Sequence, residues 1–95
     1  MKSEQAVSAL SALAQEHRLA VFRQLVQAGE DGLAAGDIAT RLDIPNSSLS
    51  FHLSHLSRSG LIVQERRGRS LIYRANYAAM NDLVAFLMEI GRAHV

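Results

Sequence analysis

The chain has 95 residues, no cysteine, no tryptophan and a formal net charge of +1. This length predicts a single domain over residues 1–95, and a second copy of so small a domain would help to complete its core. The absence of cysteine excludes disulfides, thiolate metal sites and cysteine nucleophiles. The apolar runs are too short to cross a membrane, so we expect a cytoplasmic protein without a membrane partner.

The charge is distributed unevenly along the chain. Residues 46–74 contain five arginines and one glutamate, a net charge of +4, whereas residues 1–45 carry −2 and residues 75–95 carry −1. A solvated face would explain the basic segment. A surface that faces a polyanion would explain it as well, because nucleic-acid binding requires concentrated cations rather than a high total charge.

The first half of the chain has the apolar spacing of short amphipathic helices. This spacing predicts helices over residues 5–14, 16–28 and 33–42. In the second helix the residues expected to point inward are Leu19, Phe22, Leu25 and Val26. Pro45 disfavours a helical conformation at Ile44, which predicts a tight turn before the next helix.

A fourth helix is predicted from Pro45 or Asn46 through Ser59, with Gly60 ending it. Its apolar positions Leu49, Leu53 and Leu56 fall on one stripe. The opposite face combines small hydroxyls, the aromatic Phe51 and an arginine, and has no acid. Small polar side chains let a helix approach a groove closely, and a phenylalanine can contact a thymine methyl. The alternative for Phe51 is a core position.

The residues after Gly60 favour β-structure. Two runs of β-forming residues, 61–66 and 69–74, flank Arg67 and Gly68, which predicts a hairpin with a basic tip. Asn76 then caps a last helix that extends to about Gly91. This helix is apolar over much of its circumference, so we expect a partner helix to cover it.

Two helices joined by a tight turn and followed by a basic hairpin favour a helix-turn-helix with a wing. The fold predicted is mainly α-helical with a β-hairpin wing, in the order four helices, two strands and a last helix. Its helix-turn-helix covers residues 33–59 and its wing residues 61–74. The residues predicted to contact DNA are Asn46, Ser47, Ser48, Ser50, Phe51, Ser54, His55, Arg58, Arg66, Arg67 and Arg69.

Several segments of the chain resemble the ArsR/SmtB family. They are the run from Ala14 to Leu25, Asp37-Ile-Ala with Leu42, Ser48 to Leu56, Gly60-Leu61 and Arg67 to Tyr73. The resemblance runs from about Leu10 to Leu87. It implies a homodimeric winged-helix transcriptional repressor of bacteria, associated with the nucleoid when bound to DNA. Such a repressor binds a pseudo-palindromic operator and is released by an inducer, usually a metal or metalloid ion.

The family resemblance also implies dimerisation through the first and last helices, here residues 5–14 and 76–91. The residues predicted at that interface are Val7, Leu10, Tyr77, Met80, Val84, Leu87 and Met88.

The ligands by which related sensors hold their ions are missing. Ala34 and Gly36 stand where arsenic and cadmium sensors have a Cys-x-Cys pair, and Val84 stands where zinc sensors have a histidine after Asp82. Soft metalloids need soft ligands, so we predict no metal site and no cofactor. Either the inducer is not a thiophilic ion or the chain is altered relative to a sensing parent.

The histidines have structural explanations. His52 borders the buried stripe of the fourth helix and His55 points sideways, whereas His17 begins the second helix. A zinc site that joins His94 to Glu89 or Asp82 across a dimer is the weaker alternative. The fourth helix has no carboxylate to orient its serines and histidines, so we expect no catalysis. The alternatives to a metal-released repressor are a protein-interaction module and a regulator with a non-metal effector.

Overall fold

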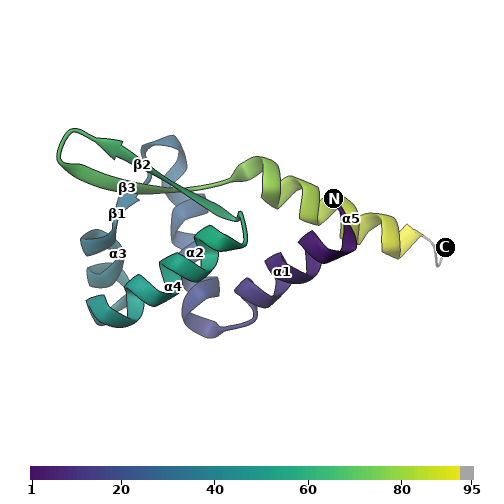
Figure 1. Ribbon diagram of the computed structural model, residues 1–95, viewed down its shortest axis with the longest axis horizontal. Helices are drawn as coiled ribbons and strands as arrows, with labels where there is room; N and C mark the ends of the chain where they lie inside the picture. The colour runs from purple at the N-terminus through teal and green to yellow at the C-terminus, as the bar shows by residue number, and fades with distance from the viewer. Residues whose placement is uncertain (93–95) are drawn as a thin grey trace.

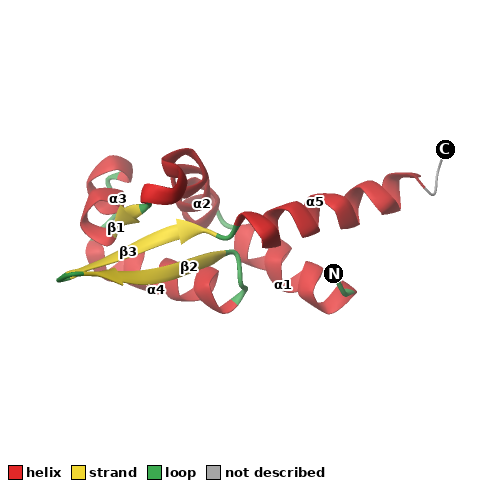
Figure 2. Ribbon diagram, turned by 90° about the horizontal axis from the view of Figure 1, so that it is seen from above, coloured by secondary structure: helices red, strands yellow, loops and turns green. Residues whose placement is uncertain are grey.

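The computed structural model of the protein describes residues 1–92. Its elements are α1 (Ser3–Leu13), α2 (Glu16–Ala28), the 3-10 turn η1 (Gly29–Asp31), β1 (Leu33–Ala34), α3 (Ala35–Leu42), α4 (Asn46–Arg58), β2 (Ile62–Arg67), β3 (Ser70–Ala75) and α5 (Tyr77–Arg92). Helices α2, α3 and α4 form a body beside the sheet, and α1 and α5 extend together from one end (Figures 1 and 2). The molecule is therefore elongated, 48 × 24 × 20 Å. This arrangement is the predicted winged helix-turn-helix.

The core lies where α1, α2 and α4 meet the base of the hairpin. Helix α4 buries the predicted stripe of Leu49, Leu53 and Leu56. The other large core residues are Val21, Phe22, Leu25, Leu33, Ile38, Ile44, Leu61, Ile62 and Leu83, and the alanines Ala12 and Ala75 are enclosed with them. Burial of these side chains provides most of the driving force for the fold, at about 25 cal/mol per Å² of apolar surface.

The first helix spans Ser3–Leu13 rather than the predicted residues 5–14, and the second differs from its predicted packing. Helix α1 turns the alanines Ala6, Ala9 and Ala12 into the core, so Val7 stays 65% exposed. The second helix has its predicted bounds, but the inward position assigned to Leu19 is wrong, because Val21 takes the core position and Leu19 is 51% exposed. The small side chains of α1 allow this helix to pack closely against its neighbours.

The side chain of Arg18 joins α1 to α2. Its Nε donates a hydrogen bond of 2.7 Å to the carbonyl oxygen of Ala12, at the end of α1. The last turn of α1 has no basic residue of its own. Arg18 therefore supplies the cation that favours a helix C-terminus, where carbonyls lack partners within the helix.

The helix-turn-helix begins two residues later than predicted. Leu33 and Ala34 form the short strand β1, which pairs antiparallel with β3, and α3 starts at Ala35. The preceding Gly32 has φ +63°, and a Cβ there would collide with the carbonyl oxygen of Tyr73. The close approach of this segment to β3 thus explains why the chain is extended here.

The turn between α3 and α4 confirms the effect expected of Pro45. Asp43 ends α3 in the left-handed conformation (φ 52°, ψ 49°), and the amide of Ile44 donates to the carbonyl of Ala39 at 3.1 Å. Pro45 takes the N-cap position and α4 runs to Arg58. Gly60 follows with φ +82°, as expected of a glycine that ends a helix.

The hairpin tip lies one residue further along than predicted. Arg67 pairs with Ser70, so the two loop residues are Gly68 and Arg69 rather than Arg67 and Gly68. Gly68 has φ +62°, and Arg69 is not left-handed, which is the pattern of a type II′ hairpin turn. The three strands have the order β1-β3-β2.

Helix α5 spans Tyr77–Arg92, so it begins directly after the predicted cap and ends one residue beyond Gly91. The cap assigned to Asn76 is confirmed, because its Oδ1 accepts a hydrogen bond of 3.2 Å from the amide of Ala79. Asn76 also donates from its side chain to the carbonyl of Gly60. These bonds fix the direction in which α5 leaves the wing.

Candidate nucleic-acid interface

The outer face of α4 is exposed, and the ring of Phe51 on it meets the ring of His52 edge-on, with centroids 6.0 Å apart. The exposed residues of this face are Asn46, Ser47, Ser48, Ser50, Phe51, Ser54 and Arg58. Phe51 is 62% exposed, so a core role for it is wrong. A large apolar side chain that a fold leaves in solvent, among hydroxyls, suits contact with a partner surface.

The amino end of α4 supports the binding of an anion on this face. The side chain of Pro45 has no acceptor with which to cap the first amides, and the first turn contains no acid. The partial positive charge of the helix end is therefore available to a phosphate. This helix is 13 residues long, so its dipole is fully developed.

A cleft separates α4 from the wing. Its volume is about 300 Å³, and its lining residues are Ser50, Leu53, Ser54, Ser57, Arg58, Gln64 and Tyr73. The lining has hydroxyls, an amide and one arginine, and no carboxylate. Sequence reasoning identified the α4 side of this cleft but missed Gln64 and Tyr73, because only the sheet register brings them opposite the helix.

The three wing arginines differ in what surrounds them. Arg66 and Arg69 are exposed, and neither side chain has a hydrogen-bond partner within residues 1–92. Arg67 is also exposed in part, but its guanidinium is bound to its own chain, at Glu65 and at the carbonyls of Glu30 and Asp31. The structure thus brings Arg66 and Arg69 to the tip as free cations and Arg67 as an engaged one.

Two histidines lie behind the outer face of α4. His52 is buried, as expected, and its ring meets that of His17 edge-on with centroids 5.5 Å apart. Burial lowers the pKa of His52, and the positive charges of Arg18, His17 and His55 lower it further. His55 is half-buried, and burial followed by Arg18 and Arg58 lowers its pKa too.

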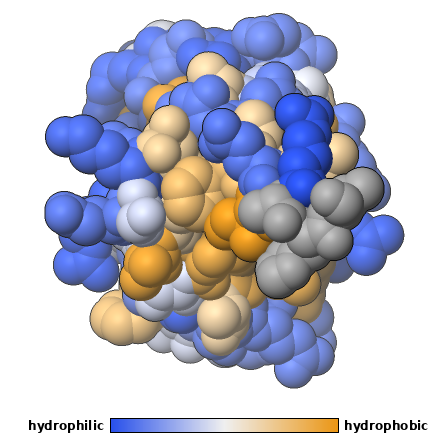
Figure 3. All heavy atoms as spheres, turned by 90° about the vertical axis from the view of Figure 1, so that its right-hand side faces the viewer, coloured by the Kyte–Doolittle hydropathy of each residue, from blue (hydrophilic) through white to orange (hydrophobic). Residues whose placement is uncertain are grey.

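The α1 and α5 end of the molecule carries an apolar surface. Its exposed large residues are Val7, Leu10, Val84, Leu87, Met88 and Ile90. Figure 3 views this end and shows hydrophobic side chains gathered in one area with polar groups around it. Of the other predicted interface residues, Met80 is half-buried, and Tyr77 donates from its hydroxyl to the carbonyl of Val26 in the same chain.

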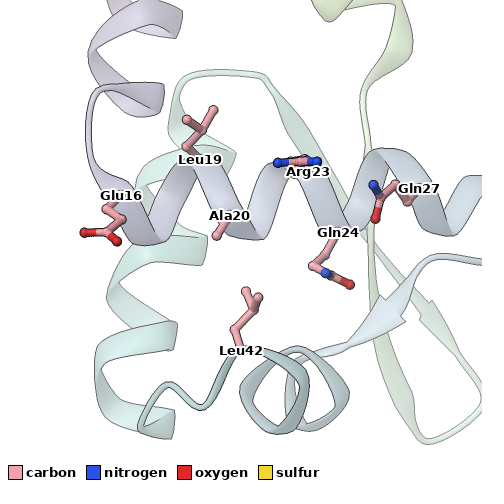
Figure 4. Close-up of a pocket in the computed structure, with 7 residues that line it drawn as sticks. All are labelled: Glu16, Leu19, Ala20, Arg23, Gln24, Gln27 and Leu42. Carbon is pink, nitrogen blue, oxygen red and sulfur yellow. The ribbon is translucent and has the colours of Figure 1, made fainter.

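A second hollow lies between α2 and α3 (Figure 4). Its volume is about 390 Å³, and Leu19, Ala20 and Leu42 supply its apolar side while Glu16, Arg23, Gln24 and Gln27 surround it. This hollow is not predictable from the sequence, where the spacing of α2 assigns Leu19 to the core. The exposure of Leu19 is thus explained by this groove.

The positions that hold ions in related sensors are unsuited to metal binding. Ala34 lies in β1 and Gly36 in the first turn of α3, while Val84 is an exposed apolar residue of α5. Within residues 1–92 no three histidine, aspartate or glutamate side chains lie together as metal ligands. His94 lies outside the described residues. No helix in residues 1–92 is long and apolar enough to span a membrane.

Comparisons with known proteins find a helix-turn-helix in the same part of the chain. Residues 13–65, more than half of the chain, match a family described as a helix-turn-helix domain. The transcriptional activator HlyU of Vibrio cholerae is 29% identical over 85 residues, which cover 90% of this chain and 76% of HlyU.

Two solved structures extend the similarity to nearly the whole chain. An ArsR-like transcriptional regulator from Rhodococcus sp. RHA1 is 30% identical with a TM-score of 0.86, over 95% of this chain and 82% of the other. The homodimeric winged helix-turn-helix DNA-binding domain Mb0332 of Mycobacterium bovis is 27% identical with a TM-score of 0.74, over 96% and 82%.

The helix-turn-helix, the basic wing and these similarities define a winged helix-turn-helix protein that regulates transcription by binding DNA and is not an enzyme. The chain belongs to the ArsR/SmtB family of such regulators.

Proposed function

We propose that the protein is a single-domain, homodimeric repressor that inserts α4 into the major groove of a pseudo-palindromic operator. The observation that carries this proposal is the acid-free outer face of α4 beside the free wing arginines. In it, Ser47 and Ser50 bond to base edges and Phe51 contacts a thymine methyl. Repression follows if the bound dimer occupies the promoter and excludes RNA polymerase.

The remaining contacts position the protein on the phosphate backbone. Arg58 and the first amides of α4 bind phosphates beside the major groove, and Arg66 and Arg69 reach the adjacent backbone or minor groove. Asn46, Ser48, Ser54 and His55 complete the surface that faces DNA. Phosphate contacts set orientation, whereas base contacts set sequence preference.

Dimerisation is supported by the apolar surface of α1 and α5. Val84, Leu87 and Met88 are each at least 44% exposed on one side of α5, beside Val7 and Leu10 of α1. Burying these side chains against a second copy removes an apolar area that is costly in water. A two-fold dimer places the two α4 helices in successive major grooves and thus selects a symmetric operator.

Release of the operator is proposed to follow binding of an inducer that needs no thiolate. The chain has no cysteine, and residues 1–92 contain no group of histidines and carboxylates placed for a metal. Such an inducer would therefore be held without a thiolate and without a cluster of metal ligands. A thermal-shift screen of metals and small organic acids against the free protein identifies the class of compound that binds.

The decisive experiment is selection of bound sequences from random 30-bp duplexes at several salt concentrations. We expect a two-fold symmetric sequence with half-sites about 10 bp apart or a multiple of this, and an affinity that falls steeply with salt. No enrichment and no binding at low salt would contradict the proposal and favour the protein-interaction module. Transcription in vitro from a promoter that contains the selected site tests the direction, and activation would overturn repression.

A further inference from the structure

The guanidinium of Arg67 is engaged on all three of its nitrogens. Nε donates to Oε1 of Glu65 at 2.7 Å, Nη1 to the carbonyl of Asp31 at 2.9 Å and Nη2 to the carbonyl of Glu30 at 2.9 Å. Hydrogen bonds from a charged donor are about twice as strong as neutral ones. A phosphate that approached Arg67 would have to replace these three acceptors.

The two carbonyls lie where a cation is favoured. They belong to η1, which continues directly from α2, and neither element has a basic residue in its last turn. Carbonyls at the end of a helical segment lack partners within it and carry partial negative charge. Arg67 thus does for α2 and η1 what Arg18 does for α1, but from 36 residues further along the chain.

These bonds attach the far end of β2 to the helical body. Arg67 is the last residue of β2 and adjoins the tip residues Gly68 and Arg69. Its partners in η1 precede β1, which pairs with β3. A second link joins η1 to the inner part of β3, since Nη1 of Arg74 lies 3.4 Å from Oε2 of Glu30. The outer half of the hairpin is therefore held at a fixed angle to the body that carries α4.

We propose that Arg67 is a positioning residue for DNA binding, which fixes the wing so that Arg66 and Arg69 meet the duplex while Arg67 itself contacts no phosphate. This inference rests on the proposed function of the wing. It changes the role that the sequence predicts for Arg67, which groups it with its two neighbours as a DNA contact.

Substitution of Arg67 by lysine separates the two roles. Lysine keeps the charge but is a single point donor, so it cannot bond to Glu65 and to both carbonyls in the way that the planar fork does. If Arg67 positions the wing, Arg67→Lys and Arg67→Ala weaken binding to the selected operator alike, by about fivefold for the loss of charge-assisted bonds. If Arg67 binds a phosphate, Arg67→Lys retains near wild-type affinity.

The salt dependence of binding gives the matched control. Arg69→Ala removes a free cation, so the slope of log K against log salt should fall by roughly 0.9 per protomer. Arg67→Ala should leave this slope unchanged, because the bound state still makes the contacts of Arg66 and Arg69 after the wing is ordered. A slope lowered as much by Arg67→Ala as by Arg69→Ala would overturn the proposal.

Hydrogen exchange of the free protein tests, without DNA, the clip that the three hydrogen bonds of Arg67 form between β2 and η1. Amides of residues 63–74 should exchange about fivefold faster in Arg67→Ala and Arg67→Lys than in wild type, and at the wild-type rate in Arg69→Ala. Unchanged hairpin exchange in both Arg67 variants would overturn the proposal. Should the wild-type protein bind no duplex, the proposed function fails, whereas faster hairpin exchange would still establish the clip.

Discussion

Helices α4 and α5, at the two ends of the molecule, expose opposite kinds of surface. Helix α4 buries one leucine stripe and exposes hydroxyls, Phe51 and Arg58, and its fold is complete within one chain. Helix α5 buries Leu83 alone among its residues and leaves Val84, Leu87, Met88 and Ile90 in solvent. Under the proposed function, α4 has its core contacts within one chain and binds a charged partner, whereas α5 requires an apolar partner to cover its exposed side.

This difference shows how the proposed functions depend on each other. Polar contacts to DNA are individually weak and are screened by salt, so one copy of α4 and the wing binds modestly. Apolar burial at the α1 and α5 end is not screened, and it would double the number of contacts held by one molecule. The apolar end would therefore determine how tightly the polar end binds at a given salt concentration.

The largest effect is expected from a charge on the apolar side of α5. Val84→Lys places an ammonium where the proposed partner helix packs, so the dimer should dissociate. Linked half-site binding is then lost, and operator affinity should fall by about 100-fold or more. Sedimentation measures the dissociation and fluorescence anisotropy the affinity.

The adjacent residue offers a matched control for this substitution. Ala85 is also exposed, but it lies on the side of α5 that carries Asp82 and Glu89. Ala85→Lys should therefore leave the dimer and the operator affinity near those of wild type. Dissociation by both variants, or by neither, would show that the apolar side of α5 is not the interface.

The two ends also differ in how far the sequence determined them. The bounds of α2 and α4 and the cap at Asn76 were predictable, because apolar spacing, Pro45, Gly60 and Asn76 act locally. Strand β1 was not predictable, because two residues are too few to show a period and its partner Tyr73 is 40 positions away. The core position of Val21 in place of Leu19 depends on the phase of α2 against α4, which spacing alone leaves undetermined.

The role of Arg67 shows the same limit at the site. Because of its charge, the sequence predicts Arg67 as a DNA contact together with Arg66 and Arg69. Two of its acceptors are backbone carbonyls, which every residue possesses, so the sequence contains no pattern that predicts these hydrogen bonds. The candidate surface on α4 could thus be predicted from side-chain chemistry, whereas the different roles of the wing arginines follow from the hydrogen bonds that Arg67 of β2 makes to η1.

Phe51 and Leu53 provide a smaller test, within α4 itself. Phe51→Ala removes an exposed ring, so the free energy of unfolding should stay within about 0.5 kcal/mol. The free energy of operator binding should weaken by about 1.5–3 kcal/mol, the value of burying a large apolar side chain. Leu53→Ala empties a buried position and should cost about 2–5 kcal/mol of stability. Urea unfolding and anisotropy measure both quantities. A large loss of stability in Phe51→Ala would contradict the division of α4 into two faces.

The smallest effect concerns His52, which lies between the two faces of α4. Its pKa is lowered in the folded protein by burial and then by the charges of Arg18, His17 and His55. As the pH falls below the pKa of about 6.5 for an unfolded histidine, His52 therefore becomes protonated in the unfolded chain before it does so in the folded chain. The free energy of unfolding should fall as the pH drops below that value and should gain nothing more from His52 well above it.

The variant His52→Gln isolates this contribution, because glutamine does not titrate. At one fixed protein concentration, which a dimer requires, urea unfolding at pH 5.5 and 7.5 should show a smaller difference in His52→Gln than in wild type. His55 retains part of the dependence, since burial, Arg18 and Arg58 lower its pKa as well. An equal pH dependence in both proteins would contradict this prediction. It would mean that the folded and the unfolded chain protonate His52 equally easily, so that burial of the ring and its contact with His17 do not disfavour the charged form.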